Sequence, residues 1–141
     1  MDKMVKMDEM PVKLSVEMGG YETGNVSLLL HEIRHALKRL LDTGETTTID
    51  LRSLPFAPGE IDRLITFLGK GEISVHLNAL GESEISETSF SGVWVIIHYN
   101  SNKEVMGKFI EVAHMPSIAE AQTPDVEDAL SSLQTKLENF E

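Results

Sequence analysis

The chain contains no cysteine in its 141 residues. Disulfide bonds, thiolate-ligated zinc, iron–sulfur clusters and cysteine nucleophiles are therefore excluded. Aromatic residues are also scarce, at 6%, and Trp94 is the single tryptophan. Because Trp94 lies in the apolar run VWVIIHY, we expect it in the core.

Basic residues are few: 12 lysines and arginines face 23 aspartates and glutamates, and the net charge is −11. A protein that binds nucleic acid or an anionic membrane surface would normally carry a basic patch, so we expect neither partner. No apolar run approaches the ~20 residues of a membrane span, so no membrane insertion is expected. The first ten residues, MDKMVKMDEM, are charged where a secretory signal has its apolar centre, which favours a cytoplasmic protein.

The stretch GNVSLLLHEIRHALKRLLDTGETTTIDLRSLPFAP, residues 24–58, organises the rest of the chain. Its first part has helical spacing, with Asn25 or Ser27 as the expected cap and Gly44 as the expected end. Thr46–Leu51 is short and β-branched, which is typical of a strand. The apolar stripe that the helix must bury consists of Leu29, Leu30, Ile33, Ala36, Leu37, Leu40 and Leu41.

The remaining periodicity predicts an α+β (or α/β) fold with a mixed sheet of four to six strands, two main helices packed on it and a C-terminal helix. We expect residues 1–10 to form a flexible arm, residues 11–122 a single globular domain and residues 123–141 the C-terminal helix. The second main helix is expected to begin at Pro58 and end at Gly69. The further predicted strands are Pro11–Met18, Glu72–Leu80, Glu82–Phe90 as an acidic edge strand, Val93–Tyr99 at the centre and Val105–Ala113.

The C-terminal helix carries Val126, Leu130, Leu133 and Leu137 at spacings of 4, 3 and 4. Such a narrow apolar seam indicates a helix that docks lightly on its own domain or pairs with a partner helix. We favour docking on its own domain.

His31-Glu32-Ile33-Arg34-His35 matches the H-E-x-x-H pattern of zinc proteases. Both histidines lie opposite the leucine stripe, no G-x-x-H follows, and Arg34, Lys38 and Arg39 would repel a dication. The pattern is therefore interpreted first as a solvated helix face, with a partner-contact face, a weak metal site on His31 and His35, and catalytic zinc as alternatives. No catalytic residue, metal or cofactor is assigned.

Two further groups of polar residues have both a structural and a functional interpretation. His76, His98 and His114 come from different predicted strands and are interpreted as separate histidines, with a metal triad as the alternative. Asp50 and Arg52 lie at a strand end and are expected to form a salt bridge that fixes the following loop, with a functional role as the alternative.

Three blocks in order resemble the HupH/HyaF hydrogenase expression/formation family: GNVSLLLHEIRHALKRLLDTGETTTIDLRSLPFAPGE, GEISVHLNALGESEISETSFSGVWVIIHYN and FIEVAHMP. The resemblance covers about residues 24–122 and corresponds to the C-terminal conserved region of longer members. It implies a non-enzymatic accessory protein, or chaperone, in [NiFe]-hydrogenase maturation. It also implies that this protein binds a hydrogenase subunit precursor or another maturation factor.

We expect the partner contacts to come from the polar face of the first helix, the Asp50–Pro58 loop and the exposed end of the hairpin formed by the last two predicted strands. A homo-oligomer, joined through the C-terminal seam, is an alternative to this interpretation, and a zinc-dependent hydrolase using His31, Glu32 and His35 is another. The acidic surface is expected to attract a basic segment of the precursor, such as a twin-arginine signal region. The candidate contact residues are His31, Glu32, Arg34, His35, Asp50, Arg52, Pro55 and Pro58.

Overall fold

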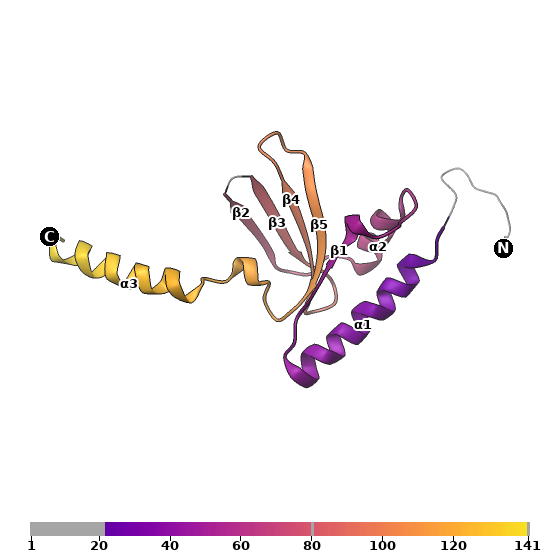
Figure 1. Ribbon diagram of the computed structural model, residues 1–141, viewed down its shortest axis with the longest axis horizontal. Coiled ribbons are helices and arrows are strands. Elements are labelled where there is room, and N and C mark those ends of the chain that lie inside the picture. Colours follow the sequence, from indigo (N-terminus) through magenta and orange to yellow (C-terminus); the bar gives the residue numbers. More distant parts are fainter. Residues whose placement is uncertain (1–21, 80, 141) are drawn as a thin grey trace.

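The computed structural model describes residues 22–79 and 81–140. This part of the chain forms a five-stranded sheet in the order β1-β5-β4-β3-β2 (Figure 1). The α+β class is confirmed. All four strand pairings described are antiparallel, whereas a mixed sheet was expected. The elements are α1 (Asn25–Thr43), β1 (Thr47–Asp50), η1 (Leu51–Ser53), α2 (Glu60–Leu68), β2 (Ser74–Asn78), β3 (Glu82–Glu87), β4 (Val93–Tyr99), β5 (Val105–Val112), η2 (Ser117–Ala119) and α3 (Thr123–Glu138).

Helix α1 forms over the predicted residues and ends at Gly44, whose positive φ of 78° lets its N–H donate to the Leu40 carbonyl. The predicted caps are wrong, because Gly24 is the N-cap and the first N–H of the helix, that of Asn25, donates to the Thr23 hydroxyl at 3.1 Å. The predicted stripe is buried or half-buried except for Leu41, which is 81% exposed although Leu40, on the same turn, is buried.

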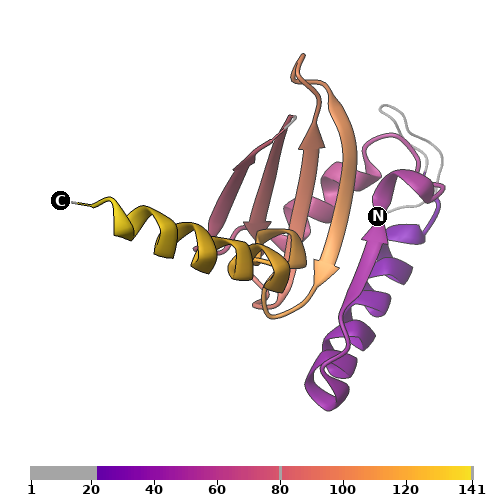
Figure 2. The same ribbon diagram turned by 60° about the vertical axis from the view of Figure 1, so that its left-hand side comes forward.

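Helix α2 begins after Gly59, so Pro58 precedes the helix and does not occupy its first turn. Helices α1 and α2 cover the same face of the sheet (Figures 1 and 2). The core between them includes Leu64 and Leu68 from α2 and Val93, Val95, Ile110 and Val112 from the sheet.

The opposite face of the sheet carries a smaller cluster of Ile85, Trp94 and Ile96, with Phe109 packed against it. Trp94 is buried, as predicted, and its indole N–H donates to the Ala113 carbonyl at 2.9 Å.

Strand β3 is internal, between β2 and β4, so the prediction of an acidic edge strand at residues 82–90 is wrong. Ile85 is fully buried, and this apolar side chain holds the strand inside the sheet. The charge of Glu84 is accommodated because the Tyr99 hydroxyl donates to it at 3.3 Å and the His76 ring lies 4.0 Å away. Glu84 thus has polar neighbours without lying at an edge.

Helix α3 extends away from the sheet (Figures 1 and 2), and all of its residues are exposed. The favoured docking on its own domain is therefore wrong for this structure, because the seam residues remain 53–60% exposed. The predicted strand Pro11–Met18 and the predicted arm lie outside the described residues. None of the described helices is long and apolar enough to cross a bilayer.

Candidate partner-binding groove

The polar face of α1 lies where the helical wheel placed it. His31, Glu32, Arg34 and His35 are all exposed, because the opposite face packs on the sheet. The two histidines of the H-E-x-x-H pattern therefore point to solvent instead of into an enclosed cleft. Within residues 22–79 and 81–140, no three histidine, aspartate or glutamate side chains are grouped so as to hold a metal.

His76 and His98 are separated by the sheet, and His114 is exposed after the end of β5. The register pairs His76 with Glu84 and Glu84 with Ile97, whereas His98 pairs with Ser83, one residue along β3. Because successive strand residues point to opposite faces, His76 and His98 lie on different sides of the sheet. His98 is held on its side by Ser83, with Oγ and Nδ1 2.6 Å apart.

The loop after β1 is fixed, although not by the predicted salt bridge. Asp50 Oδ1 accepts a hydrogen bond from the Arg52 backbone N–H at 3.0 Å and so caps η1. The Arg52 guanidinium donates to the Val105 carbonyl on the neighbouring strand at 2.9 Å. The two charged side chains thus fix the loop through separate partners.

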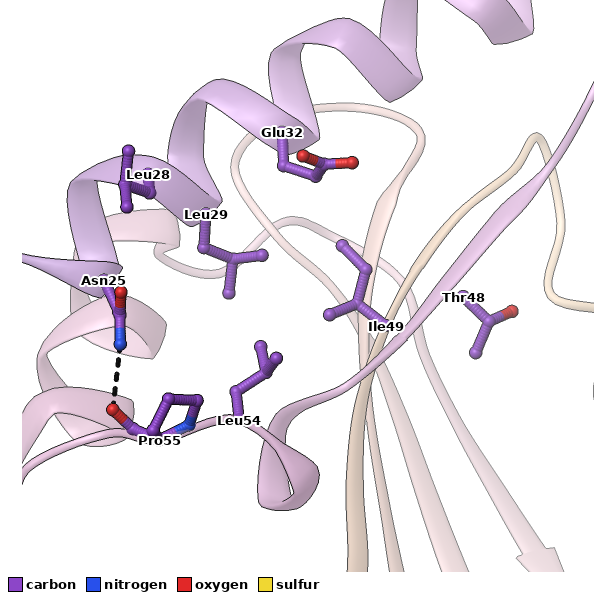
Figure 3. A pocket seen from close by; sticks show the side chains of 8 residues that line it. All are labelled: Asn25, Leu28, Leu29, Glu32, Thr48, Ile49, Leu54 and Pro55. Carbon is purple, nitrogen blue, oxygen red and sulfur yellow. Dashed lines mark hydrogen bonds between the residues drawn. The ribbon is translucent and has the colours of Figure 1, made fainter.

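A groove lies between α1, β1 and this loop, with a volume of about 360 Å³ (Figure 3). Leu29, Ile49 and Leu54 point toward one another across it. The Glu32 carboxylate lies at its border, on the next turn of α1. Asn25 Nδ2 donates to the Pro55 carbonyl at 2.9 Å and ties the helix to the loop at one end. The lining is completed by Leu28, which is 66% exposed, and Thr48.

Glu60 fixes the shape of this end of the molecule. It is 2% exposed, and its carboxylate accepts hydrogen bonds from the Ala57 N–H (2.7 Å), the Thr23 hydroxyl (2.8 Å) and the Thr23 N–H (3.0 Å). One side chain therefore holds together the entry to α1, the loop and the start of α2. The sequence analysis did not identify Glu60; the signal was an acid in the first turn of a helix, directly after Pro58-Gly59.

A second hollow, of about 260 Å³, lies on the other flank of α1. Phe67 and Phe90 stack there with their ring centroids 6.3 Å apart, and both are largely exposed. Of the described residues that line it, Arg34 is charged and the rest are apolar; besides the two phenylalanines these are Leu30, Ile33, Leu37, Leu68 and Val93.

The predicted contact residues therefore do not form one site but lie in several places on this side of the molecule. Glu32 and Pro55 line the groove, and Arg34 lines the second hollow. His31 and His35 are exposed on α1 and line neither of them, whereas Asp50, Arg52 and Pro58 are exposed in and beside the loop. The sequence analysis missed Leu28 and Leu54, because isolated exposed leucines carry no periodic signal.

The chain is similar to a known protein family and to a solved structure. The family described as "HupH hydrogenase expression protein, C-terminal conserved region" matches residues 23–140. A solved structure, hydrogenase expression protein HupH from Thiobacillus denitrificans ATCC 25259, is 42% identical with a TM-score of 0.79, over 85% of this chain and 100% of that one.

Curated relatives are similar over a shorter share of their length. Hydrogenase expression/formation protein HupH of Rhodobacter capsulatus is 30% identical over 67% of this chain and 34% of its own length. The HupH of Rhizobium leguminosarum bv. viciae is 26% identical over 78% of this chain and 39% of its own. The chain thus aligns with little more than a third of each of these two relatives.

Proposed function

The chain belongs to the HupH hydrogenase expression protein family through its C-terminal conserved region, and from this premise we propose that it acts in hydrogenase maturation. The relatives named above are hydrogenase expression or hydrogenase expression/formation proteins. The observation that carries the proposal is that the family match spans the helices, the sheet and the loop that build the groove.

In this proposal the protein is a non-enzymatic accessory factor, or chaperone, of the cytoplasm that binds a hydrogenase subunit precursor or another maturation protein. The surface we assign to the contact is the exposed side of α1, the Asp50–Pro58 loop and the groove between them. Exposed apolar side chains beside polar ones are typical of surfaces that bind other proteins. Glu32 supports binding over catalysis, because the described residues that line the groove with it are mainly apolar, with Asn25 and Thr48 as the polar ones and no histidine among them.

Co-purification tests the proposal. The tagged chain, expressed in hydrogenase-producing cells, is expected to retain a hydrogenase subunit precursor or a maturation protein, identified by mass spectrometry. The matched variants are Leu28→Ser in the groove and Leu41→Ser on the last turn of α1, both exposed leucines of one helix. We expect Leu28→Ser to lower the yield of partner and Leu41→Ser to leave it unchanged. Recovery of no hydrogenase or maturation protein by the unmodified chain would refute the proposal.

Glu32→Gln separates binding from a zinc-dependent hydrolase. A hydrolase of the H-E-x-x-H type would lose its activity, because the glutamate activates water. An accessory factor would keep its partner and its ability to restore hydrogenase activity to a strain that lacks the protein. Loss of that restoration with partner binding intact would favour the hydrolase.

Helix α3 favours one second function, self-assembly. Val126, Leu130, Leu133 and Leu137 lie at spacings of 4, 3 and 4 and are 53–60% exposed. Light scattering on the chain with and without residues 123–141 tests this function. A mass that falls from a multiple of the 15.7 kDa chain to that of a monomer on truncation would support it.

A further inference from the structure

In the part of the chain that the structure describes, strand β1 lies at an edge of the sheet beside the groove. Among the described residues, β1 pairs only with β5, where Thr47 faces Val112 and Ile49 faces Ile110. A short edge strand with an exposed side is a site where another extended chain can add to a sheet.

The hydrogen bonds of β5 show which groups of β1 face outward. The Ala113 N–H donates to the Gly92 carbonyl, toward β4, at 2.9 Å. Because successive residues of a strand direct their backbone groups to opposite sides, those of Val112 and Ile110 point to β1. Hence Thr47 and Ile49 bond to β5, whereas the N–H and C=O of Thr48 and the N–H of Asp50 point away from the sheet.

The groove receives a side chain from any strand added at this edge. A residue opposite Ile49 shares the face of Ile49, and that face is the one covered by α1. Its side chain would therefore enter the space between Leu28, Leu29 and Leu54. The residues on either side of it would point to the opposite face. The site is thus built for one large apolar side chain on an extended backbone.

The charged residues in and near the groove indicate which side chains the added strand should carry near its apolar residue. Of the described residues that line the groove, Glu32 is the one with a charged side chain. Arg39, toward the other end of β1, donates to the Thr47 hydroxyl at 3.0 Å and lies 3.9 Å from Glu45, so its charge has an acidic neighbour. The net charge of −11 adds a general attraction for cations.

We propose that β1 and the groove bind an extended segment of the partner by strand addition, with a large apolar residue in the groove and lysine or arginine two residues away from it, on the same face of the segment. The identity of the protein that supplies the segment rests on the proposed function; the mode of binding does not. Because β1 is four residues long, its outward groups offer few backbone bonds, and the apolar side chain must supply much of the affinity.

Defined peptides test the binding mode without any hydrogenase. The probe is a fluorescein-labelled decapeptide of sequence GKTKTLTKTG, followed by fluorescence anisotropy. The matched peptides replace the central leucine by serine, or the three lysines by glutamate. Burial of one leucine side chain predicts that the leucine peptide binds at least about tenfold tighter than the serine peptide. We expect the glutamate peptide to bind more weakly still.

Two pairs of variants locate the site on the protein. Leu28→Ser is matched by Leu41→Ser, as above. Thr48→Pro removes an outward N–H from the β1 edge, and its match is His76→Pro on β2, the other edge strand, where the same alternation directs the backbone N–H outward. Leu28→Ser and Thr48→Pro should each lower the affinity for the leucine peptide about tenfold. The controls Leu41→Ser and His76→Pro should bind this peptide as the unmodified chain does. Unchanged circular dichroism verifies that each variant folds.

The occupant is identified by crosslinking. Because the chain has no cysteine, Leu28→Cys provides a single site for a benzophenone maleimide. Irradiation should join this position to the leucine peptide, with mass spectrometry locating the bond. Crosslinks that persist to residues 1–21 of the same chain or to a second copy would overturn the proposal, as would equal binding of the leucine and serine peptides. If hydrogenase partners co-purify while no groove variant weakens them or the peptide, strand addition fails and the proposed function stands.

Discussion

Replacement of Glu60 by glutamine is expected to destabilise the protein by about 2 kcal/mol. The amide retains the shape of the side chain, but its NH₂ group must replace one carboxylate oxygen. If the amide oxygen keeps the Ala57 N–H and the Thr23 hydroxyl, the NH₂ group faces the Thr23 N–H, and two donors oppose each other. A partly buried donor without an acceptor costs roughly 1–3 kcal/mol, and the two remaining bonds lose their charge assistance.

The assay is urea denaturation followed by circular dichroism, with the slope m held common so that a change of midpoint reports stability. Asp62→Asn is the matched control, because Asp62 lies in the same first turn of α2 but is exposed. It should change the free energy of unfolding by less than about 0.5 kcal/mol. If Glu60→Gln costs no more than Asp62→Asn, the three contacts do not hold α1, the loop and α2 together, and our account of how the groove is shaped is wrong.

Three other predictions follow from the same structure. Truncation after Gln122 should leave the free energy of unfolding within about 0.5 kcal/mol of that of the full chain, because no residue of α3 is buried; urea denaturation measures it. Trp94→Phe should cost roughly 1–3 kcal/mol, since the buried Ala113 carbonyl loses the indole N–H as its donor. Burial, followed by the charge of Glu84 and the hydrogen bond to it, raises the pKa of Tyr99 above its ordinary value of 10.0. Stability from Tyr99 should therefore be complete below pH 10 and fall as the pH rises through the raised pKa, because the unfolded chain ionises first; absorbance at high pH follows the titration.

Each of these predictions has its own control. A truncated chain that unfolds at much lower urea would show that α3 packs on its own domain. Trp94 is the only tryptophan, so its fluorescence maximum should shift to longer wavelength when the unmodified chain unfolds. Tyr21→Phe leaves Tyr99 as the only tyrosine, and Glu84→Gln should then lower its pKa. An unchanged titration of Tyr99 in Glu84→Gln would contradict the contribution that we assign to Glu84.

Local patterns in the sequence were sufficient to predict most of the elements. The leucine spacing of α1, the glycine at its end and the alternation in β4 and β5 each follow from contacts within a few residues. The outward position of His31 and His35 followed from the same wheel, because a helix that buries one side must expose the other. The family resemblance was likewise carried by continuous blocks of sequence.

Contacts between distant segments decided the rest. The acids of β3 indicated an edge strand, yet the burial of Ile85 between β2 and β4 places that strand inside the sheet. The groove joins Leu28 to Leu54, residues whose separation along the chain says nothing about their separation in space. The role of Glu60 depends on Thr23, 37 residues away. A sequence pattern reports which side of an element is apolar, whereas the position of each side chain depends on the element that packs against it, and only the tertiary structure supplies that neighbour.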